Sequence, residues 1–188
     1  MIKKITKEPS TALFPVPTVL VTSCLEESSP NIVTIAWTGI MNSVPPVVYI
    51  GLRPEGRHSY RLIKDSGEYV INIPTAGQAK LVDYCGTVSG SKVNKFKETG
   101  LTPVPASHVK APLIAECPVN LECKVRQVFS LGSHDVFIAD VLAVHYNEDM
   151  LDEKGHPDMD KIKPYGYCGN EYRLMADKLG SFGYSKKG

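Results

Sequence analysis

The amino-acid sequence predicts a mainly β protein, an antiparallel β-barrel accompanied by short helices. Most of its apolar runs are short, rich in β-branched residues and separated by turn residues, and the two longest runs are only two residues apart. No GxGxxG motif stands between a strand and a helix, which argues against the common dinucleotide-binding fold. The 188 residues suit one domain, expected to span residues 1–188.

The N-terminal third of the chain is expected to form strands and a first helix. Residues 18–24 (TVLVTSC) and 31–37 (NIVTIAW) are predicted as the two strands of a hairpin, joined by a polar turn at residues 26–30. Residues 47–52 (VVYIGL) are a further strand. The apolar period then becomes helical over residues 53–66, so this strand leads into a short helix.

The middle of the chain alternates between strand and helix signals. Residues 68–74 (EYVINIP) are predicted as a strand, followed by a helix over residues 76–86 that stops at Gly86. Residues 87–112 contain several prolines and glycines and are expected to wrap the barrel, with one helical turn at residues 93–98.

The strongest strand signals lie in the C-terminal half. Residues 117–132 and 135–148 have high β propensity and are predicted to form one long antiparallel hairpin. Residues 170–179 are expected to form a short helix, and residues 180–188 an extended end.

Composition excludes several classes of protein. A formal net charge of +1 provides no broad field that would attract nucleic acid or an anionic membrane. No apolar run reaches the ~18 residues that cross a bilayer, and prolines interrupt the stretch that could serve as a secretory signal. The five cysteines form no CxxC and the histidines lack metal spacing, so neither a disulfide framework nor a metal site is predicted. A cytoplasmic protein is expected.

The first candidate for chemistry is the end of the second strand. Asn31, Thr34, Trp37 and Thr38 lie there beside free backbone donors and acceptors. Such an edge, with an aromatic ring nearby, can pair with a flat polar heterocycle such as a flavin. The alternative is that Trp37 is a core or interface anchor.

The second candidate is the loop that joins a strand to the first helix. Arg53, Arg57, His58 and Ser59 combine with the free N–H groups of a helix start, which together make a plausible cradle for phosphate. Alternatively, Ser59 is the helix N-cap and the arginines form a solvated face.

Two further segments give weaker signals. The glycine-containing loop with Ser89, Gly90 and Lys92 can approach an anion closely, although its lysines, Lys95 and Lys97 included, also fit a solvated helix face. At the hairpin tip, His134 could contact a substrate or a nicotinamide cofactor. The alternative for His134 is an ordinary turn residue.

Segments from residue 12 to residue 184 match, in order and spacing, those of a known family. They are TALFPVPTVLVTS, PNIVTIAWTGI, PPVVYIGLRP with HSYRLI, GEYVINIP, DYCGTVSG with VNKF, APLIAECPVNLECKV, LGSHDVFIADV and KLGSFGYS. With them the chain resembles the flavin reductase-like proteins of the FMN-binding split barrel, particularly the flavoredoxin branch. The resemblance implies a split β-barrel with Greek-key-like antiparallel strands.

The resemblance also implies a homodimer with FMN at its interface. The implied contacts are Thr34, Ile35, Ala36, Trp37 and Thr38 along the isoalloxazine ring, Arg53, His58 and Ser59 at the phosphate or ribityl chain, and Ser89 and Gly90 over the cofactor. The partner subunit and the C-terminal tail near Tyr165 and Tyr184 are expected to contribute.

Two departures from the family pattern concern a basic contact. Relatives often read SGRxxDKF, whereas this chain has Ser91 in place of the arginine and Asn94 in place of the aspartate. Lys92, one position away, is the candidate replacement for the missing charge. His134 resembles the histidine of a GxH hairpin, which implies that a nicotinamide donor stacks near it.

The resemblance implies an oxidoreductase in which FMN takes electrons from a reduced donor, NAD(P)H, and passes them to a flavin, a protein or a metal complex. The flavin then carries the chemistry, and no side chain is required as acid or base. Three alternatives stay open: an electron carrier with tightly bound FMN, a flavin-binding module without turnover, and a relative that binds heme. The sequence leaves the donor, the acceptor and the choice between NADH and NADPH open.

Overall fold

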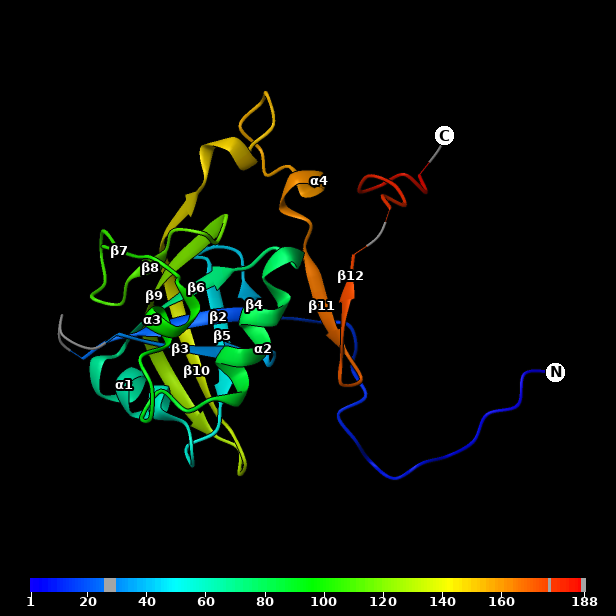
Figure 1. Ribbon diagram of the computed structural model, residues 1–188. Helices are drawn as coiled ribbons and strands as arrows, with labels where there is room; N and C mark the ends of the chain where they lie inside the picture. Colours follow the sequence, from blue (N-terminus) through cyan, green and yellow to red (C-terminus); the bar gives the residue numbers. More distant parts are fainter. Residues whose placement is uncertain (26–29, 176, 187–188) are drawn as a thin grey trace.

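The protein is described by a computed structural model that covers residues 1–25, 30–175 and 177–186. Its main feature is a curled sheet of seven strands in the order β3-β2-β6-β9-β10-β5-β4, in which every neighbouring pair is antiparallel (Figure 1). This half-barrel confirms the mainly β prediction. The strands are β2 (Val19–Ser23), β3 (Asn31–Ile35), β4 (Thr38–Asn42), β5 (Val47–Leu52), β6 (Glu68–Ile73), β9 (Val119–Ser130) and β10 (Asp135–Tyr146).

Short helices and small sheets complete the fold. The helical segments are α1 (His58–Ser66), η1 (Ala76–Gln78), α2 (Ala79–Thr87), α3 (Lys95–Thr99), η2 (Glu148–Met150) and α4 (Met159–Ile162). A three-stranded sheet joins β1 (Val16–Pro17), β11 (Tyr165–Cys168) and β12 (Glu171–Leu174), and β7 (Pro103–Val104) pairs with β8 (Leu113–Ile114). Figure 1 shows β11 and β12 standing beside the half-barrel. None of the helices described is long and apolar enough to span a bilayer.

Strand β2 is buried along its whole length because both faces of the sheet are covered there. Val19 and Val21 belong to the core inside the curled sheet, whereas Leu20 packs with Val82 of α2 and Phe96 of α3 on the outside. Successive side chains of a strand point to opposite faces, so a continuous apolar run fits a strand covered on both sides. β2 is therefore held between two packed layers, the core inside the curled sheet and the helices outside it.

The long C-terminal hairpin is confirmed. Strands β9 and β10 pair from Asp135 opposite Ser130 to Tyr146 opposite Val119. At the tip, the backbone N–H of Leu131 donates to the carbonyl of His134, and Gly132 has a φ of 95°, which favours glycine. This turn fixes the backbone on either side of His134.

The helix predicted over residues 170–179 is wrong. Residues 171–174 form β12, which pairs with β11 across Gly169 and Asn170. Both turn residues have positive φ, 56° and 73°, as a two-residue hairpin turn requires. The extended end predicted over residues 180–188 is also wrong over 182–185, where the chain turns.

The other predicted elements differ from the structure in smaller ways. The predicted helices over residues 53–66, 76–86 and 93–98 correspond to α1, to η1 with α2, and to α3. The predictions did not include β4, β11 or the short strand β1. Of the polar turn predicted at residues 26–30, only Pro30 lies within the described residues.

Candidate functional site

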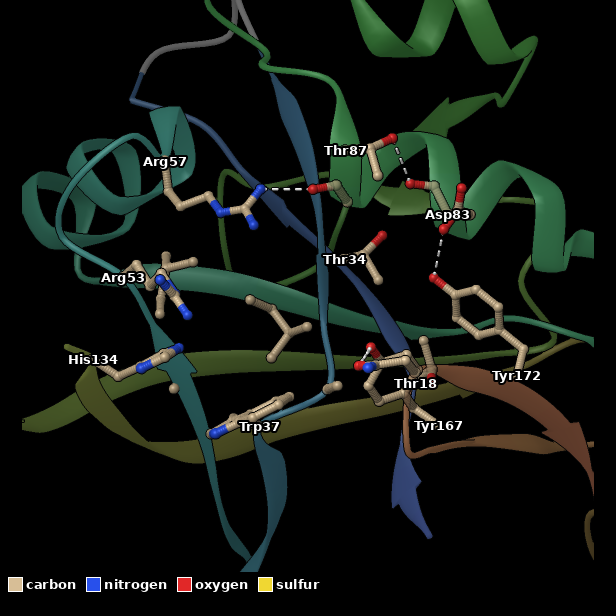
Figure 2. Close-up of a pocket in the computed structure, with 16 residues that line it drawn as sticks. Thr18, Thr34, Trp37, Arg53, Arg57, Asp83, Thr87, His134, Tyr167 and Tyr172 are labelled. Carbon is tan, nitrogen blue, oxygen red and sulfur yellow. Dashed lines mark hydrogen bonds between the residues drawn. The ribbon is translucent and has the colours of Figure 1, made fainter. Parts of the chain in front are cut away.

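A cavity of about 390 Å³ opens where β3 and β5 end, beside α2, the tip of the β9–β10 hairpin and the β11–β12 turn (Figure 2). Side chains from distant parts of the chain meet there because the sheet curls, which brings β3, at one edge, close to β5, next to the other edge. Seven candidate residues named from the sequence line it: Thr34, Ile35, Ala36, Trp37, Arg53, Arg57 and His134. We refer to it as the wide cavity.

A second cavity of about 70 Å³ adjoins the wide one and is called the narrow cavity below. Five other predicted residues line it: Asn31, His58, Ser59, Ser89 and Gly90. Arg57 and Thr87 line both cavities and so mark where the two meet. The two cavities together form an elongated site, broad at one end and narrow at the other.

Four predicted residues lie outside these two cavities. Lys92 lines a separate cavity of about 410 Å³. Thr38 lines another, of about 600 Å³, and its hydroxyl donates to the carbonyl of Tyr49 at 2.6 Å. Tyr165 is buried in the packing between the sheet and α2, and Tyr184 is exposed in the tail.

The narrow cavity is shaped by an amide, a hydroxyl and a glycine. Asn31 donates through Nδ2 to Oγ of Ser59 at 2.8 Å, and both side chains are buried. The N-cap of α1 is Arg57, so the alternative that Ser59 caps the helix is wrong. A Cβ atom at Gly90 would lie well inside van der Waals contact with the amide of Asn31, so this close approach requires glycine.

Arg57 lies between the two cavities. Its Nη1 donates to the carbonyl of Gly86 at the end of α2, at 2.7 Å (Figure 2). This single bond leaves other guanidinium N–H groups for a ligand. The sequence offered Arg57 only as one of several charges in its loop, and the structure places it in both cavities.

Lys95 is a site residue that the sequence reasoning assigned to a solvated face. It lines the narrow cavity and is only 3% exposed. Its Nζ donates to the carbonyl of Ile32 at 2.7 Å and to that of Cys85 at 2.6 Å, and within the described part of the chain no carboxylate pairs with it. Burial lowers the pKa of Lys95 to about 8. One of its three N–H donors is left for another acceptor.

The wide cavity has polar groups on two sides. Arg53 and Arg57 lie on one side, and Asp83, which accepts a hydrogen bond from Tyr172 at 3.0 Å, lies on the other (Figure 2). Thr18 also lines this cavity, and its hydroxyl is buried without a hydrogen-bond partner in the described structure. A buried hydroxyl of this kind calls for a partner, which a ligand in the cavity would supply.

Trp37 and His134 face one another on the wall of the wide cavity. The side of the cavity formed by these two residues is called its mouth below. Their rings are parallel, with centroids 5.9 Å apart, and Ser133 Oγ is 2.9 Å from His134 Nδ1. Trp37 is 43% exposed, so the alternative that it is a core residue is wrong. Burial, with the positive charges of Arg53 and Arg57, lowers the pKa of His134, which keeps the ring neutral at pH 7.

Comparison with known proteins identifies the family. A family model described as "Flavin reductase like domain" matches residues 11–175. The chain belongs to the flavin reductase-like family. The flavoredoxin of Desulfovibrio vulgaris (Miyazaki F) is 33% identical, with a TM-score of 0.90 over 98% of this chain and all of that one. This confirms the resemblance found in the sequence.

Two further proteins are similar to this flavin reductase-like chain over most of its length. A flavoredoxin from Methanosarcina acetivorans is 27% identical, with a TM-score of 0.87 over 98% of this chain and 99% of that one. A protein of Archaeoglobus fulgidus is 35% identical over 147 residues, which are 78% of this chain and 80% of that protein. The described residues of this family member contain no group of three or more histidine, cysteine, aspartate or glutamate side chains arranged to hold a metal ion.

Proposed function

We propose that this chain binds FMN in the two adjoining cavities and passes electrons from a reduced donor, NAD(P)H, through the flavin to a flavin, protein or metal acceptor. The observation that carries the proposal is the shape and charge of the site. FMN has a flat ring and a flexible chain that ends in a phosphate. A broad cavity that narrows into a small one lined by cationic and hydroxyl groups suits such a molecule.

The wide cavity suits the isoalloxazine ring. Residues 34–37 line it, and the hydroxyl of Thr18 is a buried donor without a partner in the described structure. These groups would orient the ring by hydrogen bonds, while Trp37 would cover its edge at the mouth. The bound flavin would supply the capacity to accept and release electrons, which no side chain here has.

The narrow cavity suits the phosphate. Lys95 has a buried ammonium without a carboxylate partner, and Arg57 lies at the entrance with free N–H groups. Ser59 accepts its bond from Asn31 through the oxygen, so its own hydroxyl hydrogen is available to donate. In a site shielded from water such charge-assisted hydrogen bonds are strong.

The mouth of the wide cavity suits the donor. His134 is neutral at pH 7 and presents a flat ring, and Arg53 adds a positive charge close to it. A nicotinamide dinucleotide carries both a flat ring and phosphates, which this pair of side chains could receive. We therefore assign Arg53 and His134 to the donor side of the proposed site.

A second candidate function is an electron carrier that keeps FMN bound and reacts little with NAD(P)H; the similarity to two flavoredoxins favours it. The visible spectrum of the purified protein, followed by anaerobic titration with NADH and NADPH, separates the two. Flavin absorbance that bleaches with a nicotinamide supports the reductase, and bleaching with dithionite alone supports the carrier. A colourless protein that takes up no added FMN overturns both.

We also propose that the protein is a homodimer. β4 is an edge strand of the large sheet, and Ile40 and Val44 on and beside it are 82% and 90% exposed, with Met41 between them also exposed. An apolar, unpaired edge usually meets another surface. Light scattering on the eluting protein is expected to give twice the chain mass of 20.6 kDa. The dimer is proposed to work in the cytoplasm, where thiols stay reduced.

Replacing Gly90 by alanine is expected to weaken FMN binding about tenfold or more. The added methyl group would collide with the amide of Asn31 and push it away from Ser59, which would distort the narrow cavity. A buried polar group that loses its hydrogen-bond partner costs about 1–3 kcal/mol, and each 1.4 kcal/mol is about tenfold in affinity. Titration of flavin-free protein with FMN measures the change.

Gly77→Ala is the matched control, because a methyl group there would make only an ordinary contact, 3.6 Å from the hydroxyl of Thr75. The control should bind FMN like the wild type. Equal FMN affinity in Gly90→Ala and the wild type would contradict the assignment of the narrow cavity.

A further inference from the structure

A hydrogen bond behind the mouth of the wide cavity involves two residues that line neither cavity. The hydroxyl of Tyr60, on α1, donates to Oδ2 of Asp135, the first residue of β10, at 2.6 Å. Asp135 is only 7% exposed. This bond also raises the pKa of Tyr60, so the tyrosine is a protonated donor at neutral pH.

Asp135 lies at the end of the sheet, beside the two proposed donor-side residues, Arg53 and His134. It lies opposite Leu52, the last residue of β5, in the register of the two strands. Arg53 directly follows Leu52, and His134 directly precedes Asp135. An interaction that holds Asp135 in place therefore also holds the backbone from which the side chains of Arg53 and His134 extend.

Tyr60 is itself held firmly. Its ring packs edge to face on Phe137 of β10, with centroids 5.6 Å apart, and the ammonium of Lys64 lies 5.5 Å from its ring centroid. The preceding residue, Ser59, lines the narrow cavity. The nine-residue helix α1 thus contributes two adjacent residues to the proposed site. Ser59 lines the proposed phosphate end, and Tyr60 supports the proposed donor end.

We propose that Tyr60 and Asp135 are positioning residues for the electron donor: their hydrogen bond holds His134 and Arg53 in the orientation that receives NAD(P)H. This inference rests on the proposed function. The pair touches neither cavity, so its loss should change the use of the donor and leave the retention of FMN unchanged. Without this bond the backbone beside His134 would still be held by the turn and by the pairing of Asp135 with Ser130 and Leu52, but the anchor on the Asp135 side chain would be lost.

The test compares Tyr60→Phe with Tyr69→Phe in the full-length, FMN-loaded protein. Tyr69 is a matched control because it is fully buried and its hydroxyl also reaches β10, at the carbonyl of Phe137, 3.5 Å away and inside the core. Tyr60→Phe is expected to raise the apparent KM for the nicotinamide donor about tenfold with kcat nearly unchanged, the size expected when a bond to a charged group is lost. Tyr69→Phe should leave KM unchanged.

A second readout needs no donor. NMR titration of the His134 imidazole, assigned by its absence in His134→Asn, should give a pKa below the ordinary 6.5 in the wild type and closer to 6.5 in Tyr60→Phe. Burial and the charges of Arg53 and Arg57 lower this pKa only while the ring is held in its place beside them. Asp135→Asn keeps an oxygen acceptor for Tyr60 and should keep most of the wild-type behaviour.

The outcomes separate this inference from the proposed function. If no nicotinamide reduces even the wild type, the reductase fails, and the His134 titration alone decides whether the pair positions the ring. The inference is overturned if Tyr60→Phe leaves both KM and the titration unchanged, if Tyr69→Phe changes them equally, or if Tyr60→Phe releases FMN.

Discussion

Lys95→Met is expected to weaken FMN binding about a hundredfold, because it removes a buried positive charge from the proposed phosphate end. Lys95 already uses two N–H groups on the carbonyls of Ile32 and Cys85, and the third is available for the phosphate. Removing one partner of a desolvated charge pair costs about 2–5 kcal/mol, and each 1.4 kcal/mol is about tenfold in affinity. Calorimetric titration of flavin-free protein with FMN measures the loss.

Riboflavin shows whether the lost affinity belongs to the phosphate, because it has the same ring and no phosphate. Lys95→Met should bind riboflavin like the wild type. Lys97→Met, on the exposed side of α3, is the control and should bind both flavins normally. Lys92→Met tests the earlier candidate for the missing basic contact. A loss in Lys92→Met and none in Lys95→Met would contradict the assignment to Lys95.

The pH dependence of FMN binding follows from the same residue. In the flavin-free protein, burial lowers the pKa of Lys95 to about 8, and the phosphate binds best to the protonated amine. Affinity is therefore expected to fall as the pH rises above about 8. It should also fall below about pH 6, where the phosphate loses its second charge. In Lys95→Met the alkaline decrease should disappear and the acid one should remain.

The sequence predicts the half-barrel because most of its strands are buried on at least one face. In β5 that burial produces a continuous apolar run, and β2 begins with three apolar residues, which local patterns reveal. β12 was mistaken for a helix because its own residues, EYRL, have no strong strand preference. Its pairing depends on the Gly169–Asn170 turn and on β11, which is a tertiary effect.

For the candidate site, sequence reasoning found the segments and misjudged individual side chains. The NIVTIAW strand and the loop after β5 were identified because polar groups follow an apolar strand. Lys95 was missed because alternating lysines suggest a solvated helix face, and only the packing of α3 against β3 buries one of them. Likewise, no sequence pattern near Thr18 shows that its hydroxyl is buried without a hydrogen-bond partner, since that depends on the whole fold.

Glu122→Gln is expected to lower the free energy of unfolding by about 3–5 kcal/mol, which is about 6–20 °C in melting temperature for a chain of this length. Glu122 lies on β9 and is fully buried. Its two carboxylate oxygens accept the backbone N–H groups of Ser107, His108 and Val109 at 2.6–3.1 Å, and His145 Nε2 lies at 2.6 Å. An amide nitrogen in place of Oε2 would face the backbone N–H groups of His108 and Val109, and in place of Oε1 it would face that of Ser107.

The same carboxylate gives the stability a dependence on pH. Burial by itself would raise the pKa of Glu122, but the N–H groups of Ser107 and His108 together with His145 outweigh it and hold the pKa below its ordinary value of 4.5. A carboxyl with a depressed pKa in the folded state stabilises the protein above the unfolded value, and this contribution is lost as the pH falls through the folded value. Wild-type stability should therefore decline below about pH 4.5 more steeply than that of Glu122→Gln.

Glu116→Gln is the matched control for this carboxylate, because Glu116 is exposed and its hydrogen bonds, among them that from the backbone N–H of Thr102, lie at the surface. It should cost about 1 kcal/mol or less, as expected for a hydrogen bond that water can replace. Denaturant unfolding of both variants at pH 7 and at acid pH measures the difference. If Glu122→Gln costs no more than Glu116→Gln, the carboxylate does not hold the loop before β8, and that segment must be fixed by the packing of Val109 and Leu113 against Val70.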